Sequence, residues 1–114
     1  MKIVFLAPGW EDYLFWQQYD QKILMKINSL LKEIKQTPFK GTGKPEALKH
    51  NLSGWWSSRI NLEHRLVYRV DKKSIVVLQC RYHYELWISR MYRVWRCAPL
   101  AKLQYEVALD FSIL

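Results

Sequence analysis

The chain has 114 residues, half of them apolar and six of them Trp, which indicates one small globular domain and excludes intrinsic disorder. Its 18 Lys and Arg residues against 10 Asp and Glu residues give a net charge of +8, which predicts attraction to a polyanion, either nucleic acid or an acidic protein. No apolar run approaches the roughly 20 residues that cross a bilayer, and the two cysteines have neither metal-type nor disulfide-type spacing, so we expect a cytoplasmic protein with reduced thiols.

The N-terminal part predicts one strand followed by two helices. The apolar run KIVFL (2–6) is typical of a short buried strand. WEDYLFWQQY (10–19) predicts an aromatic-rich helix with Glu11 and Asp12 in its first turn. Asp20 is a suitable N-cap for the second helix, whose apolar residues recur with a period of 3.6: Ile23, Leu24, Ile27, Leu30, Leu31 and Ile34.

Residues 36–53 contain Pro and Gly but few apolar residues, and therefore predict a loop with one helical turn at residues 46–50. The GTGK core lacks both the spacing and the Ser or Thr of a phosphate-binding loop, because Pro45 follows Lys44. One carboxylate, Glu46, is instead surrounded by basic residues, namely Lys40, Lys44, Lys49 and His50.

Three strand-like runs follow, at residues 54–60, 64–70 and 74–84, and their short separators suit hairpins. The element order is therefore β-α-α-β-β-β. We expect an α+β fold in which an antiparallel sheet carries two helices on one face.

Period-two alternation predicts which side chains share a face of this sheet. Leu66, Tyr68 and Val70 should lie under the helices, with Arg65, Val67 and Arg69 on the open face. In the last strand Val76, Leu78 and Cys80 alternate with Val77, Gln79, Arg81 and His83. If the strands are in phase, the open face collects Arg59, Arg65, Arg69, Arg81 and His83, whereas a slip of one residue would invert a strand.

A basic sheet face with a loop carboxylate and a histidine suits RNA cleavage without a metal. A general base takes the proton of the ribose 2′-OH, a general acid protonates the departing 5′-oxygen, and cations stabilise the phosphorane. Glu46, His83 and Arg65 fit these three roles by residue type. Taken singly, each also has an ordinary explanation as a solvated or structural residue. His50 and His64 have no Cys or carboxylate at ligand spacing, so we expect no zinc site.

The run TPFKGTGKPEALKHNLSGWWSSRINLEHRLVYRV (37–70), closing with CRYHY (80–84), resembles the YoeB (Txe) toxins of bacterial toxin–antitoxin modules. These toxins belong to the RelE/ParE superfamily, which has a microbial-RNase-like fold. The resemblance spans residues 1–84. It implies an endoribonuclease that cuts mRNA in the A site of the 70S ribosome and so inhibits translation, with no cofactor and no metal.

The resemblance also implies site residues and partners. The family's catalytic residues fall on Glu46, Arg65, His83 and Tyr84, and its basic positions near the substrate fall on Lys49 and Arg59. With these two, we expect Lys44, Arg69 and Arg81 to bind RNA. The implied partners are an acidic, YefM-like antitoxin that neutralises the toxin and a second copy of the chain in a homodimer.

Residues 85–114 extend beyond the resemblance and match no family that we recognise. Trp87, Ile88, Met91, Val94 and Trp95 have helical spacing, which Pro99 interrupts and Leu100, Leu103 and Val107 resume. Read-through beyond an altered stop codon or a regulatory addition would both produce such an extension, and we favour the first. Because the extension leaves from Tyr84, we expect it to weaken cleavage.

Two alternatives therefore stand beside the ribosome-dependent nuclease. One is a non-enzymatic toxin on the same scaffold, like the ParE-type relatives that poison DNA gyrase. The other is a toxin that its own extension attenuates. Only the nuclease requires the intact set Glu46, Arg65 and His83.

Overall fold

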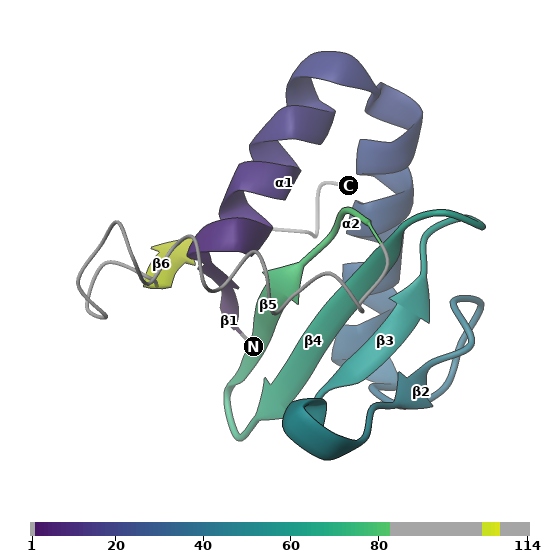
Figure 1. Cartoon of the computed structure of the whole chain (residues 1–114), viewed down its shortest axis with the longest axis vertical. Helices are drawn as coiled ribbons and strands as arrows, with labels where there is room; N and C mark the ends of the chain where they lie inside the picture. Colours follow the sequence, from purple (N-terminus) through teal and green to yellow (C-terminus); the bar gives the residue numbers. More distant parts are fainter. Residues whose placement is uncertain (1, 83–103, 108–114) are drawn as a thin grey trace.

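The structure, a computed structural model, describes residues 2–82 and 104–107 (Figure 1). The order of elements confirms the predicted α+β fold, with α2 passing behind the sheet in Figure 1. The elements are β1 (Lys2–Leu6), α1 (Ala7–Tyr19), α2 (Gln21–Gln36), β2 (Glu46–Ala47), the 3-10 turn η1 (His50–Leu52), β3 (Trp56–Arg59), β4 (Arg65–Asp71), β5 (Ser74–Gln79) and β6 (Gln104–Val107).

The sheet has the strand order β2-β3-β4-β5-β1-β6. The strands from β2 to β5 run antiparallel to their neighbours, as predicted, whereas β1 runs parallel to β5. A long crossover through the helices connects β1 to the rest of the sheet, and such a connection permits parallel pairing, which a tight hairpin does not. The sheet is therefore mixed, although mostly antiparallel.

Both helices form where the sequence predicts them, but α1 begins earlier. Pro8 lies in its first turn, where proline is favoured, so Glu11 and Asp12 fall in the second turn rather than the first. Asp12 is buried and its carboxylate accepts a hydrogen bond from the backbone N–H of Cys80 at 3.0 Å. Asp20 caps α2 as expected, because its Oδ1 accepts from the backbone N–H groups of residues 22 and 23.

The main core lies between the helices and the sheet. Leu66 and Tyr68 are fully buried there, which confirms the predicted inner face of β4. A smaller cluster lies on the opposite face of the sheet, which we call the open face, and contains no residue of α1 or α2. It consists of Leu48, Leu52, Val67 and Leu78, with Leu6 and Trp55 packed against it.

The predicted alternation along β5 is wrong for Val76, Val77 and Leu78, and Val76 pairs with Arg69 of the open face. Val77 lies in the main core and Leu78 on the open face, the reverse of the expected arrangement. The cause is a register shift: Tyr68 pairs with Val77, but the preceding residue of β4, Val67, pairs with Gln79. The extra residue in β5 is a bulge, which changes the phase of the alternation, so that Cys80 still reaches the main core.

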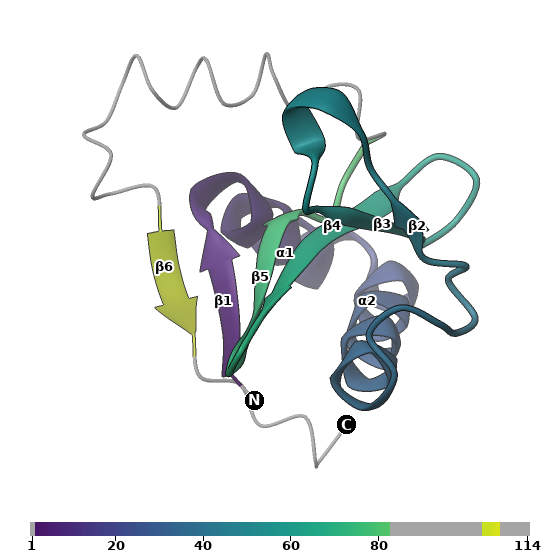
Figure 2. The ribbon, with the colours of Figure 1, turned by 90° about the horizontal axis from the view of Figure 1, so that it is seen from below.

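The extension contributes strand β6, which pairs antiparallel with the outer edge of β1. Figure 2 shows β6 and β2 at opposite edges of the sheet. The helical spacing that includes Val107 is therefore wrong for residues 104–107, because edge pairing with β1 supplies their backbone with hydrogen-bond partners. The predicted helical segment 87–95 lies outside the described residues. In the part of the chain that the structure describes, no helix is both long and apolar enough to cross a membrane.

Candidate active site

Glu46 lies on the open face of the sheet. It is exposed and pairs with Ser57 of β3, which pairs with Val67 of β4, and directly paired residues share a face. Strand β2, which contains Glu46, replaces the helical turn predicted for residues 46–50, and η1 follows at His50–Leu52. The carboxylate is thus presented by an edge strand rather than by an unattached loop.

The loop before Glu46 is attached to α2 and β3. The carboxylate of Glu33 accepts hydrogen bonds from the Thr42 backbone N–H at 3.1 Å and from its hydroxyl at 2.7 Å. Those two bonds hold the pKa of Glu33 below its usual value. The carbonyl of Gly43 accepts from the Arg59 backbone N–H at 2.8 Å.

Gly43 explains the glycine in the GTGK core. A Cβ at this position would meet Leu30 Cδ2 at 2.9 Å and Ser58 Cβ at 3.0 Å, so only glycine lets the loop lie this close to α2 and β3. The close approach brings the chain against β3 shortly before Glu46 pairs with Ser57. The segment therefore positions a carboxylate instead of enclosing a phosphate.

Two arginines lie beside Glu46 on the open face. Arg59 is the next residue of β3 on that face after Ser57, and it pairs directly with Arg65 of β4. Like charges opposite each other destabilise a sheet, which favours an anionic ligand between them. The Arg65 guanidinium also donates through Nη1 to the carbonyls of Asn61 and His64, which holds this end of the side chain near the β3–β4 turn.

Arg69 and Arg81 are placed differently from each other. Arg69 lies on the open face, where its guanidinium forms an ion pair with Asp71 at 3.3 Å and lies 4.8 Å from the Trp55 ring centre. The Arg81 guanidinium instead lies 3.6 Å from the ring centre of Phe15, a residue of α1. The predicted gathering of arginines on the open face therefore holds for Arg59, Arg65 and Arg69, and is wrong for Arg81 because the chain leaves the strand after the β5 bulge.

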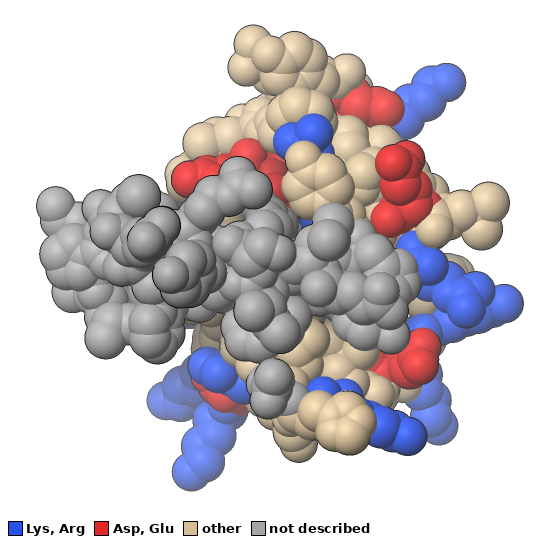
Figure 3. Space-filling model, viewed as in Figure 1, with Lys and Arg blue, Asp and Glu red and all other residues tan. Residues whose placement is uncertain are grey.

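Lysine completes the basic surroundings of Glu46. Lys44 and Lys49 are both exposed, and Lys44 adopts a left-handed backbone with φ of 50°. In Figure 3, Lys and Arg side chains gather along the right-hand margin, on the side where β2 and β3 lie in Figure 1. Such a surface attracts a phosphate backbone without regard to base sequence.

His83 and Tyr84 lie outside the described residues, but the two residues before them are placed. Sequence reasoning missed the residue that holds this end of the chain, His64, which is buried and accepts a hydrogen bond from the Tyr82 backbone N–H at 2.9 Å. A signal was present, because His64 is in phase with Leu66 and Tyr68 and so belongs to the inner face of β4.

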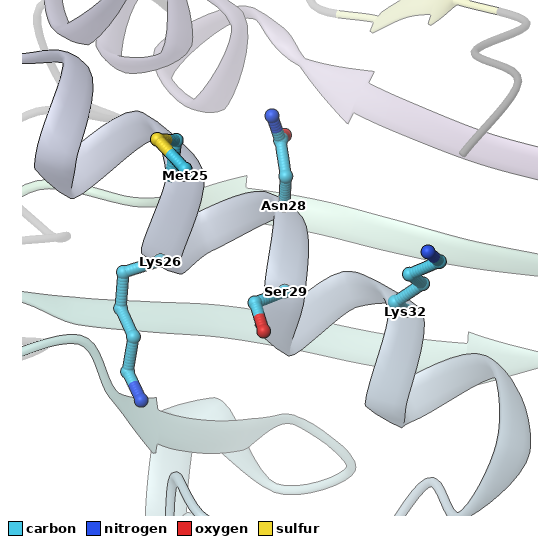
Figure 4. A pocket seen from close by; sticks show the side chains of 5 residues that line it. All are labelled: Met25, Lys26, Asn28, Ser29 and Lys32. Atoms are coloured by element: carbon cyan, nitrogen blue, oxygen red, sulfur yellow. The ribbon is translucent and has the colours of Figure 1, made fainter. Parts of the chain in front are cut away.

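A separate hollow lies on the outer side of α2. It is lined by Met25, Lys26, Asn28, Ser29 and Lys32 (Figure 4). Its described lining comes from a single helix on the far side of the sheet from Glu46, and no carboxylate or imidazole is among these described residues. Elsewhere too, within residues 2–82 and 104–107, no three His, Cys, Asp or Glu side chains come together to hold a metal ion.

A sheet of this order with two helices on its inner face defines the YoeB/RelE type of α+β fold. Residues 5–84 match the family model described as "YoeB-like toxin of bacterial type II toxin-antitoxin system". The chain is 56% identical to toxin YoeB of Escherichia coli K12 over 84 residues, which are 74% of this chain and 100% of that toxin. This chain therefore belongs to the YoeB family of toxins.

Solved structures agree with this assignment. A YoeB/ParE toxin from Agrobacterium tumefaciens is 50% identical, with a TM-score of 0.72 over 74% of this chain and 100% of that chain. Two structures from Staphylococcus aureus, a heterotetrameric YoeB–YefM complex and a YoeB dimer, are each 50% identical, with a TM-score of 0.70 over 74% of this chain and 98% of theirs. Residues 85–114 lie beyond the family match.

Proposed function

We propose that this toxin is a ribosome-dependent endoribonuclease that cuts mRNA in the A site through the ribose 2′-OH. Glu46 is the general base, Arg65 stabilises the phosphorane, and His83 with Tyr84 supplies the general acid. Attack of the 2′-oxygen on phosphorus breaks the bond to the 5′-oxygen, which takes a proton from the acid. The products are a 2′,3′-cyclic phosphate and a free 5′-hydroxyl.

The observation that carries this proposal is the open face itself. An exposed carboxylate and two directly paired arginines lie on the same side of adjacent strands. A base and a cationic anion-binding pair at neighbouring positions are what 2′-OH activation and charge stabilisation need. Lys44 and Lys49 add attraction for the RNA backbone, whereas Arg81 is engaged with α1.

The partners follow from the family. Since the S. aureus relative is solved both with YefM and as a dimer, we propose that this chain forms a homodimer and binds a YefM-like antitoxin. The net charge of +8 suits an acidic antitoxin segment, which would compete with RNA for the same basic surface.

The experiment that tests the activity is primer extension on a translated message, with and without ribosomes, using purified toxin. We expect new 3′ ends at codons in the A site only when ribosomes are present. A toxin that cuts free RNA equally well would contradict the ribosome dependence. Arrest of growth without any cut message would favour the non-enzymatic, ParE-like alternative.

A further inference from the structure

The chain after β5 is held by buried side chains instead of by strand pairing. The backbone of Cys80 is bonded on both sides to α1: its N–H donates to the Asp12 carboxylate at 3.0 Å, and its carbonyl accepts from Trp16 Nε1 at 2.8 Å. Both α1 residues are buried. The end of β5 therefore has a fixed position relative to α1.

Two consecutive residues, His64 immediately before β4 and Arg65 at its start, hold Tyr82 in the same way. The Tyr82 backbone N–H donates to His64 Nδ1 at 2.9 Å, and the Tyr82 carbonyl accepts from the Arg65 backbone N–H at 3.0 Å. Tyr82 has a φ of 68°, a left-handed conformation that a tyrosine adopts only when its surroundings impose it. The backbone N–H and carbonyl of Tyr82, the residue before His83, are thus both held by residues at the start of β4.

His64 is itself tightly placed. Its backbone N–H donates to Asn61 Oδ1 at 2.7 Å, and its carbonyl accepts from Ile60 N–H at 3.1 Å. The imidazole meets the Trp16 ring edge-on with 4.8 Å between ring centres. The His64 ring therefore contacts α1 through Trp16 and also holds the backbone of Tyr82.

The bond to Tyr82 fixes the protonation state of the ring. Nδ1 accepts only when it carries no proton, so the imidazole is neutral with its hydrogen on Nε2. Burial lowers the pKa of His64, and the charges of Arg81 and Arg65 act in the same direction, whereas Glu63, 3.6 Å from Nε2, opposes them. The neutral, accepting form is therefore the form present near neutral pH.

We propose that His64 is a positioning residue for RNA cleavage: by accepting the Tyr82 N–H, it sets the direction in which the chain continues to His83. This inference rests on the proposed function. His64 acts through the backbone and does not touch RNA. Protonation of Nδ1 would place its N–H against the Tyr82 N–H, two donors facing each other, and so break this hydrogen bond.

Two substitutions test separately the hydrogen-bond acceptor of His64 and its ring contact with Trp16. His64→Asn keeps an acceptor near the position of Nδ1 but does not titrate, whereas His64→Phe keeps the ring contact with Trp16 and removes the acceptor. Glu11→Gln, at an exposed position of α1, is the control. Each variant is measured in the full-length chain by amide hydrogen exchange at Tyr82 and by single-turnover cleavage on ribosomes.

We expect His64→Phe to speed exchange at Tyr82 and to slow cleavage, each by about tenfold, the effect of one lost hydrogen bond, with ribosome affinity unchanged. His64→Asn should stay close to wild type in both. It should also lack the loss of rate expected of wild type as pH falls through the lowered pKa of His64, below the ordinary histidine value of about 6.5. Glu11→Gln should change neither measurement.

Wild-type exchange at Tyr82 in His64→Phe, or a proton on Nδ1 in the nitrogen NMR spectrum of His64, would overturn the proposal. So would fast exchange with an unchanged cleavage rate, or an acid limb that His64→Asn retains. If the wild-type toxin cuts no RNA, the proposed function fails, while exchange and the NMR spectrum still report whether His64 holds Tyr82.

Discussion

At the scale of single residues, Glu46 and Arg65 share a face but have different surroundings. Glu46 is exposed on an edge strand, so its replacement costs the fold little. Arg65 is half-buried and donates to two carbonyls at the β3–β4 turn, so its replacement touches the turn as well as the site. Variants at the two positions therefore need different controls.

Replacing Glu46 with Gln should lower the single-turnover cleavage rate by about a hundredfold or more, because the amide cannot accept the 2′-OH proton. His83→Gln should have an effect of similar size as the loss of the general acid. Glu11→Gln, at an exposed position of α1, is the control and should cut at the wild-type rate. Turnover like that of wild type in Glu46→Gln would remove this carboxylate from the mechanism.

Arg65→Ala should damage the cleavage rate far more than ribosome association, since the phosphorane charge exists only in the transition state. A loss of about 10²–10³ in rate is typical of one removed anion-stabilising donor. Arg65→Lys keeps the positive charge but lacks the planar guanidinium with its paired donors. It should bind the ribosome like wild type and recover only part of the cleavage rate. The role assigned to Arg65 is wrong if the single-turnover rate survives in Arg65→Ala while binding weakens.

At the scale of elements, the loop before β2 is held by α2 through Glu33. The carboxylate of Glu33 accepts two hydrogen bonds from Thr42, only four residues before Glu46. Gly43 then lies against Leu30 and Ser58. The position of Glu46, the proposed general base, therefore depends on a contact with α2, on the other side of the sheet.

This contact predicts a pH dependence. Because the folded-state pKa of Glu33 lies below its usual value of 4.5, its contribution to stability is complete above about pH 4.5 and is lost as pH falls through the folded-state value. The melting temperature of Glu33→Gln should therefore lie below that of wild type at pH 7, and the difference should shrink in acid. A difference that stays constant between pH 7 and pH 3 would contradict this role.

Sequence patterns predicted the elements well because their periods are local. The stripe of α2, its Asp20 cap and the inner face of β4 all depend on neighbours within a few residues. The β5 bulge depends instead on which residue of β4 lies opposite, and no local period records that. Arg81 was misplaced because the chain leaves the strand after this bulge, and the role of His64 was missed because its hydrogen bond to Tyr82 joins residues 18 apart in the sequence.

The candidate site was less predictable from local pattern. Glu46 and Arg65 stood out only when the whole run from Thr37 to Val70 was compared with a family, because a loop carboxylate and a strand arginine are common singly. Their placement on one face, with Arg59 opposite Arg65, is a property of strand register. Register is fixed by pairing between strands that are distant in the sequence, and the spacing of residues within one strand does not predict that pairing.

At the scale of the whole molecule, the chain differs from its relatives in the extension. The 84 residues matched to the E. coli toxin end at the position of Tyr84, whereas this chain continues and places Gln104–Val107 along β1. Strand β1 would otherwise be the sheet edge, with unpaired backbone groups. The described part of the extension thus covers the edge opposite Glu46, not the edge that contains it.

Truncation after Tyr84 tests the effect of this extension. The sequence prediction that full-length toxin cuts more slowly than the truncated chain still stands, because the peptide bond to Glu85 replaces a free carboxylate at Tyr84. Truncation should also speed amide exchange along the β1 edge that pairs with β6. Equal cleavage rates, or a slower truncated chain, would show that the extension does not restrain the site.

The central claim is that the open face cuts mRNA through the ribose 2′-OH on the ribosome. The most direct measurement uses a message with a single 2′-deoxynucleotide on the 5′ side of the scissile bond, in ribosomes stalled with that codon in the A site. Removal of the nucleophile should abolish cleavage at that bond, while the matched all-ribose message is cut and yields a 2′,3′-cyclic phosphate. Cleavage of the deoxy message at the same bond and rate would contradict the account.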